Sequence, residues 1–120
     1  RLESPQGSAR KVSRVCGSSV EVDIVLDHGK VSAYGADVQA CALGQTSAAI
    51  VASAIIGATP QDVRAVREQM TAMLKADGAP PTGRWADLKY LEPVRGFPAR
   101  HASTLLVFEA LVEALDRAGA

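Results

Sequence analysis

Long apolar segments are missing from this chain of 120 residues. The longest apolar stretch, Ala48–Ile56, falls well short of the roughly 20 residues that a membrane-spanning helix requires. The opening segment RLESPQGSAR contains no apolar signal region. We therefore expect a cytoplasmic protein that does not associate with a membrane.

An excess of charge of either sign is also missing, because 13 Lys and Arg residues balance 13 Asp and Glu residues. A chain with this balance has no overall positive field that would attract nucleic acid or an anionic lipid surface. The sequence therefore predicts neither class of partner.

Cysteine is scarce, with only two residues in the chain. Small secreted domains held together by disulfides usually contain more, so we expect reduced thiols rather than a disulfide framework. The length and the hydrophobic content of 48% are typical of one compact domain. Because residues 1–10 are polar and include Pro5 and Gly7, we expect them to be a flexible segment before a single domain at 11–120.

The first half of that domain has the pattern of β-strands. Residues 20–26 alternate between apolar and polar, which predicts a strand with one buried face. Residues 27–30 (DHGK) predict a tight turn into a second strand at 31–40. The alternation shifts near Gly35, which predicts a bulge there, and residues 11–15 are a candidate third strand at the edge.

The second half has the pattern of helices. Residues 42–56 are apolar nearly all round, which predicts a central helix, and TPQD at 59–62 predicts the start of the next one. The turn-rich segment 77–98 is expected to be anchored by Trp85 and to contain a short helical turn at 84–90. Residues 102–118 predict a last helix. Strands followed by helices indicate an α+β fold, in which helices cover one face of a small antiparallel three-stranded sheet.

Three side chains that can bind metal or act as nucleophiles lie at the ends of these elements: Cys16, Cys41 and His101. Cys41 begins a helix, where the amide groups at the helix N-terminus stabilise a thiolate. The spacings of 25 and 60 residues are much longer than those of zinc knuckles, so spacing alone does not identify a metal site. Taken singly, a cysteine in an apolar neighbourhood is more often a small core residue than a ligand, and a histidine at a helix start is more often a cap or a surface group.

The motifs VCGSSVEVDIVLDHGKVSAYG, ACALGQTSAAIVASAIIGATPQDV and RHASTLL occur in an order that resembles the U-type iron–sulfur cluster assembly scaffolds. This family comprises the IscU, SufU and N-terminal NifU domains, and the resemblance covers about residues 12–118. In the family, a Cys-Gly-Asp motif precedes a strand hairpin, a second cysteine begins a long helix of small residues, and a third cysteine begins the C-terminal helix. The insertion around 77–98 is similar to the SufU branch.

The resemblance matches residues of this chain to that pattern one by one. Cys16 and Gly17 match the first motif, Cys41 matches the second cysteine, and His101 occupies the place of the third. Ser18 stands where the family has aspartate. Arg100 precedes the third ligand position, where the IscU branch has histidine.

The ligand set that this match implies is Cys16, Cys41 and His101, with Ser18 as a weak fourth candidate and Asp37 as another possible oxygen donor. Two thiolates and one imidazole suit zinc with one open position, and they also suit iron or a 2Fe–2S cluster. A neutral serine hydroxyl is a poor ligand, and the alternative reading of Ser18 is a turn residue that satisfies a local amide.

The resemblance implies a scaffold that receives sulfur from a cysteine desulfurase, holds a transient iron–sulfur cluster, and passes it to client or carrier proteins. Such a protein is not an enzyme in the usual sense. SufU-like members imply an alternative, a zinc-dependent sulfurtransferase. The family's usual sulfur acceptor is the third cysteine, which this chain lacks, so we expect Cys41 to accept the sulfur because it lies at a helix N-terminus. Arg100, beside the third ligand position, is expected to steer anionic sulfur species. A third possibility is an interaction module of the same fold without metal.

Overall fold

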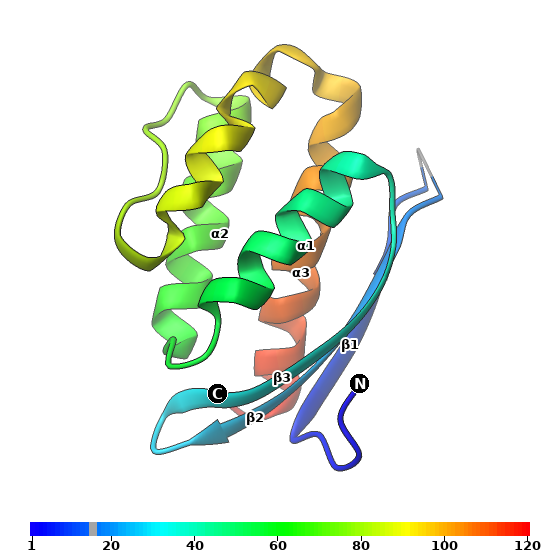
Figure 1. The fold of residues 1–120 in the computed structure, drawn as a ribbon, viewed down its shortest axis with the longest axis vertical. Helices are drawn as coiled ribbons and strands as arrows, with labels where there is room; N and C mark the ends of the chain where they lie inside the picture. Colours follow the sequence, from blue (N-terminus) through cyan, green and yellow to red (C-terminus); the bar gives the residue numbers. More distant parts are fainter. Residues whose placement is uncertain (15–16) are drawn as a thin grey trace.

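The chain folds into a three-stranded antiparallel sheet whose helices pack on one face, which confirms the predicted fold class (Figure 1). The computed structural model describes residues 1–14 and 17–120. The elements in chain order are β1 (Gly7–Val12), β2 (Ser19–Asp27), β3 (Lys30–Gln39), α1 (Ala42–Ala54), α2 (Pro60–Lys75), the 3₁₀ helices η1 (Gly83–Gly96) and η2 (Pro98–Arg100), and α3 (His101–Arg117).

The middle strand, β2, shows the predicted alternation, with Val20, Val22 and Ile24 almost completely buried under the helices. A two-residue turn joins it to β3, and both central residues have positive φ (52° at His28 and 75° at Gly29), as the twist of a tight hairpin requires.

The bulge of this hairpin lies in a different place from the predicted one. Val25 pairs with Ala33 and Leu26 pairs with Val31, so Ser32 is the extra residue. The predicted bulge at Gly35 is wrong, because Gly35 pairs regularly with Asp23.

The edge strand β1 begins earlier than the sequence suggests. It runs from Gly7 to Val12, so the prediction that ordered structure starts near Lys11, after a flexible segment 1–10, is wrong. A Cβ atom on Gly7 would lie 2.1 Å from the carbonyl oxygen of Ala114, which shows how closely β1 approaches α3. The strand looks polar because only one of its faces is covered, with Ala9 buried against the core.

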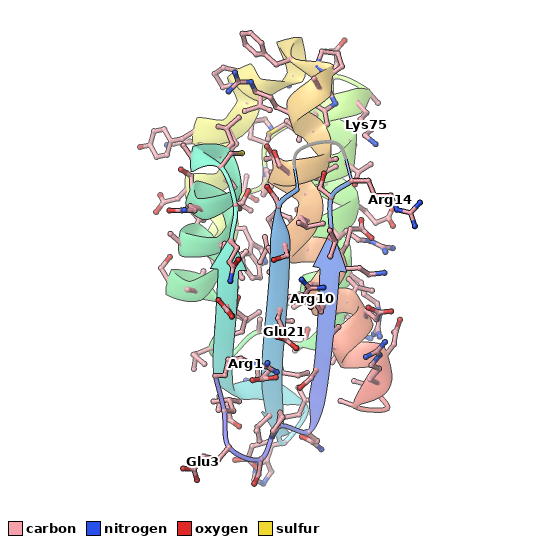
Figure 2. All side chains as sticks on the ribbon, turned by 90° about the vertical axis from the view of Figure 1, so that its right-hand side faces the viewer. Arg1, Glu3, Arg10, Arg14, Glu21 and Lys75 are labelled. Atoms are coloured by element: carbon pink, nitrogen blue, oxygen red, sulfur yellow. The ribbon has the colours of Figure 1, made fainter. Side chains whose placement is uncertain are left out.

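The outer face of the sheet is covered locally by the first residues of the chain. Arg1 donates from Nε and Nη2 to the Asp23 carboxylate at 2.9 and 2.7 Å, and it also pairs with Glu21 (Figure 2). The Leu2 amide and the Ser8 hydroxyl donate to the same carboxylate. The hydrogen bond from Arg1 is the main cause that lowers the pKa of Asp23 well below its usual range.

The central helix is α3 and not α1, which corrects the prediction. α3 packs against β1, β2, α1 and α2, and most of its residues are buried. α1 buries only Gly44, Ser47, Ala48 and Val51. The other face of α1 consists largely of alanine and short polar residues, whose exposure to water costs little free energy. The larger Leu, Val and Phe side chains of α3 are stabilised by burial.

The remaining helices follow their sequence signals more closely. α2 begins with a capping box, in which the Thr59 hydroxyl accepts from the Asp62 amide and the Asp62 carboxylate accepts from the Thr59 amide. Trp85 is buried as predicted, but the expected short turn at 84–90 is part of the longer η1 helix. In the described part of the chain, no helix is both long and apolar enough to cross a membrane.

Candidate functional site

The sheet register brings two of the predicted site segments to the same end of the molecule. Val12 pairs with Ser19, and Ser19 pairs with Gln39, so these three residues lie in line at one end of the sheet. Cys41 follows Gln39 by two residues, and Ser18 immediately precedes Ser19. Cys16 lies outside the described residues.

Backbone hydrogen bonds join the described residues on either side of the β1–β2 connection. The Ser13 amide donates to the Ser18 carbonyl at 2.8 Å, and the Gly17 amide donates to the Ser13 carbonyl at 2.9 Å. Gly17 has φ of +71°, a conformation that favours glycine, and it is exposed. Ser18 is only 3% exposed. The residue that stands in the place of the family's aspartate is therefore buried.

Cys41 is the N-cap residue of α1, with φ −65° and ψ 173°, and it is exposed to solvent. Its carbonyl accepts the first helical hydrogen bond, from the Gln45 amide at 3.0 Å. The amide groups of the first helical turn point toward this end, where they favour negative charge. The predicted placement of Cys41 at the mouth of the helix is confirmed.

The side chain of Cys41 contacts the first turn of α3. Its Sγ atom lies 3.5 Å from the Ser103 Oγ atom, and Ser103 itself is 3% exposed. α1 lies close to α3 at Gly44, where a Cβ atom would be 3.3 Å from the Ser103 carbonyl oxygen, a tight contact. The sequence analysis did not predict Ser103 as part of the site. Its position in the first turn of the last helix, two residues after His101, is the feature that could have indicated it.

His101 is the first residue of α3 and is 7% exposed. Its Nε2 atom lies 3.0 Å from the Val94 carbonyl oxygen and 3.2 Å from that of Arg95. Carbonyl oxygens only accept hydrogen bonds, so these contacts require a proton on Nε2. In the neutral ring, Nδ1 then carries the lone pair.

Arg100 is exposed and lies at the mouth of a cavity of about 380 Å³ beside the N-terminal end of α1. Two exposed aromatic side chains, Tyr90 and Phe97, are 69% and 59% accessible at this cavity. The other lining residues are Leu43, Pro93 and Val94. The predicted site is thus bordered by an apolar surface with one cation.

The structure therefore brings Cys41 against the first turn of α3, where His101 and Ser103 lie. Within residues 1–14 and 17–120, no group of three or more His, Cys, Asp or Glu side chains is arranged to hold a metal ion. The expected ligand set also includes Cys16, which is outside those ranges.

This small α+β domain, with a surface thiol at a helix N-terminus facing a second helix start, has close structural relatives. The crystal structure of a nitrogen-fixing NifU-like protein (N-terminal) from Brucella abortus superimposes with a TM-score of 0.96 and 45% sequence identity, covering 98% of this chain and 82% of that one. A candidate iron–sulfur cluster assembly scaffold protein for the SUF system from Fervidobacterium islandicum AW-1 has a TM-score of 0.86 at 21% identity, over 95% of this chain and 83% of the other.

A further similarity, at lower sequence identity, is to a curated relative. The iron–sulfur cluster assembly scaffold protein IscU of Streptococcus pyogenes serotype M1 is 22% identical over 102 residues, which cover 85% of this chain. The match spans 64% of that relative's own length. A scan against protein-family models finds no match. With the NifU-like structure at 45% identity, the chain belongs to the IscU, SufU and NifU family of iron–sulfur cluster assembly scaffolds.

Proposed function

We propose that this protein is an iron–sulfur cluster assembly scaffold that holds iron or a transient 2Fe–2S cluster through Cys16, Cys41 and His101. One observation carries the proposal. The side chain of Cys41, an exposed residue, contacts the first turn of α3, and the neutral histidine of that turn carries its lone pair on Nδ1 when Nε2–H donates to the Val94 carbonyl. The cluster is cargo here, so the site must both bind it and release it.

The contacts of His101 fit the role of a ligand. Histidines that bind metal commonly donate their other ring N–H to a backbone carbonyl, which fixes the tautomer and the ring orientation. The two carbonyls at the end of η1 accept from Nε2 in this way. The cost of burying the ring is then offset, and Nδ1 is the nitrogen we assign to the cargo.

The other predicted residues have supporting roles in the proposal. Gly17, which follows Cys16 in the sequence, has a positive φ that favours glycine. Ser18 is buried and is the weak oxygen candidate for the fourth position. Arg100 is exposed at the adjoining cavity, where its charge would attract anionic sulfur species.

Exchange of cargo requires partners to reach the thiol. Cys41 is exposed, and the neighbouring cavity combines Tyr90, Phe97 and Arg100, residue types that are enriched at protein interfaces. This surface supports docking of a cysteine desulfurase and of iron–sulfur client or carrier proteins. A cytoplasmic location, where thiols stay reduced, is part of the same proposal.

The exposure of Cys41 at a helix N-terminus also favours a second candidate function, a zinc-dependent sulfur acceptor. In that reaction the Cys41 thiolate attacks the terminal sulfur of a persulfide on the desulfurase. The S–S bond of the donor breaks, the donor cysteine leaves as a thiolate, and Cys41 carries the new persulfide. Zinc would be held by the remaining ligands of the set.

Anaerobic reconstitution with iron and sulfide, followed by visible absorption and metal analysis, tests the proposal. We expect charge-transfer bands from wild-type protein, and their loss in Cys16→Ala, Cys41→Ala and His101→Gln. His28→Gln is the matched control, because His28 is in the β2–β3 turn with 92% of its side chain accessible. A wild-type protein that holds zinc but no cluster favours the sulfur acceptor. One that binds neither iron nor zinc refutes both functions and leaves an interaction module.

A further inference from the structure

The hydroxyl of Ser103 lies between the Cys41 sulfur and a backbone carbonyl. Its oxygen is 3.5 Å from Cys41 Sγ, and it donates to the Arg100 carbonyl oxygen at 3.1 Å. A hydroxyl has one proton. In this arrangement the Cys41 thiol donates to the Ser103 hydroxyl oxygen, while the Ser103 hydroxyl donates to the Arg100 carbonyl oxygen.

Binding of cargo changes what the sulfur can do. A cysteine that ligates a metal does so as a thiolate, which has lost its proton and can only accept hydrogen bonds. If Ser103 still donated to Arg100, its oxygen lone pairs would face a negative sulfur at close range. Rotation of the hydroxyl proton toward Cys41 removes this repulsion and gives the thiolate a donor.

The Arg100 carbonyl can lose Ser103 without becoming unsatisfied. The Thr104 hydroxyl donates to the same oxygen at 2.8 Å, a shorter contact than that of Ser103. The first turn of α3 therefore contains two hydroxyls for one carbonyl, and the one nearer Cys41 is available to turn.

We propose that Ser103 is a positioning residue for the cargo site, whose hydroxyl switches from the Arg100 carbonyl to the Cys41 thiolate when metal binds. This inference rests on the proposed function. Ser103 is buried and its carbonyl packs against Gly44, so its Cβ is fixed relative to both helices. The hydrogen bond then holds the ligand sulfur toward the turn of α3 that includes His101.

The test compares four variants of the full chain. Ser103→Ala removes the hydroxyl, while Ser103→Thr and Ser103→Val have nearly equal volumes and differ by the hydroxyl alone. Thr46→Val is the matched control, because it removes a hydroxyl of α1 that donates to the Ala42 carbonyl at 2.8 Å and takes no part in the Ser103 and Arg100 arrangement. Circular dichroism selects the folded variants, and the threonine and valine pair answers the question if the alanine variant fails to fold.

The probes are zinc, whose affinity is measured by competition with a chelator, and cobalt(II), whose sulfur-to-metal charge-transfer bands report the electron density on the ligand sulfur. We expect Ser103→Ala and Ser103→Val to bind zinc roughly 10–100-fold more weakly, the usual effect of losing an outer hydrogen bond to a ligand. Their cobalt bands should move to lower energy, because a thiolate without its donor is easier to oxidise. Ser103→Thr and Thr46→Val should match wild type in both readouts.

Two results would overturn the inference. The first is zinc affinity and cobalt bands in Ser103→Ala that equal those of wild type. The second is an equal change in Thr46→Val, which would show that loss of any nearby hydroxyl has this effect and that the sulfur contact is not its cause. A wild-type protein that binds neither metal would instead refute the proposed function.

Discussion

Replacement of His101 separates the two roles that the structure gives this side chain. Its Nε2–H donates to the Val94 and Arg95 carbonyls, and Nδ1 is the nitrogen assigned to the cargo. In His101→Gln the side-chain amide can place its NH₂ group near the position of Nε2, which keeps the donor and removes Nδ1. In His101→Ala both are lost.

The structural part of the effect is modest. The Val94 carbonyl also accepts from the Phe97 amide at 2.9 Å, so the loss in His101→Ala falls mainly on the Arg95 carbonyl. Because the Arg95 contact is only partly buried, loss of its donor should cost about 1 kcal/mol, the low end of the usual range. For urea slopes of about 1–3 kcal/mol per M, the unfolding midpoint without metal should fall by about 0.3–1 M. His101→Gln should remain close to wild type.

Urea unfolding in the presence of zinc tests whether His101 is a ligand. At a zinc concentration about 100 times its dissociation constant, wild-type protein should gain about 2.7 kcal/mol of stability. A variant that binds about 100-fold more weakly gains only about 0.4 kcal/mol at the same concentration. His101→Gln should therefore unfold like wild type without zinc and well before it with zinc. An equal gain from zinc in both proteins would refute the assignment of His101 as a ligand.

Two further predictions concern buried groups outside the site. Asp23→Asn should destabilise the protein at neutral pH, because the carboxylate accepts from Arg1, whose hydrogen bond lowers its pKa. That contribution is complete above the usual pKa near 3.9 and is lost as the pH falls toward the lower folded value, so urea unfolding between about pH 2.5 and 7 should show the two proteins converging in acid. Tyr34→Phe should stabilise the protein by about 1 kcal/mol, because the Tyr34 hydroxyl is buried with no hydrogen-bond partner among the described residues. Burial raises the pKa of Tyr34 to about 12, whereas the unfolded chain loses the phenol proton near pH 10. The free energy of unfolding of wild-type protein should therefore fall as the pH rises from about 10 to 12. Urea unfolding of the Phe variant over the same pH range should not show this Tyr34-dependent fall.

Much of the fold could be predicted because local patterns and tertiary packing agree. The alternation of Val20, Val22 and Ile24 marks a half-buried strand, and these residues are the covered face of β2. The hairpin turn and the start of α2 follow from residues whose backbone preferences allow few alternatives, as Gly29 and Thr59 show.

The wrong predictions concern segments whose sequence pattern is compatible with more than one environment in the folded protein. Residues 7–10 look like a loose terminus because an edge strand has only one covered face, and Ala9 is a weak apolar signal. α1 looks central because alanine is compatible with either a buried or an exposed helix position, and only packing against α3 and the sheet decides between them.

The candidate site likewise contains residues that the sequence predicted and one contact that it could not predict. The sequence identified Cys41 and His101 from their chemistry, their places at element ends and the family pattern. It could not predict that Cys41 meets Ser103, because that contact joins residues 62 positions apart and depends on how closely α1 and α3 pack at Gly44.

The sequence alone determined most of the strands and helices, the α+β class and the family pattern, because these depend on periodicity, turn chemistry and the order of short motifs. Only the tertiary structure decided which helix is central, which nitrogen of His101 is committed to the Val94 and Arg95 carbonyls, and which hydroxyl touches the thiol. These depend on distances of a few ångströms between distant segments, and such distances are set by the packing of the whole domain.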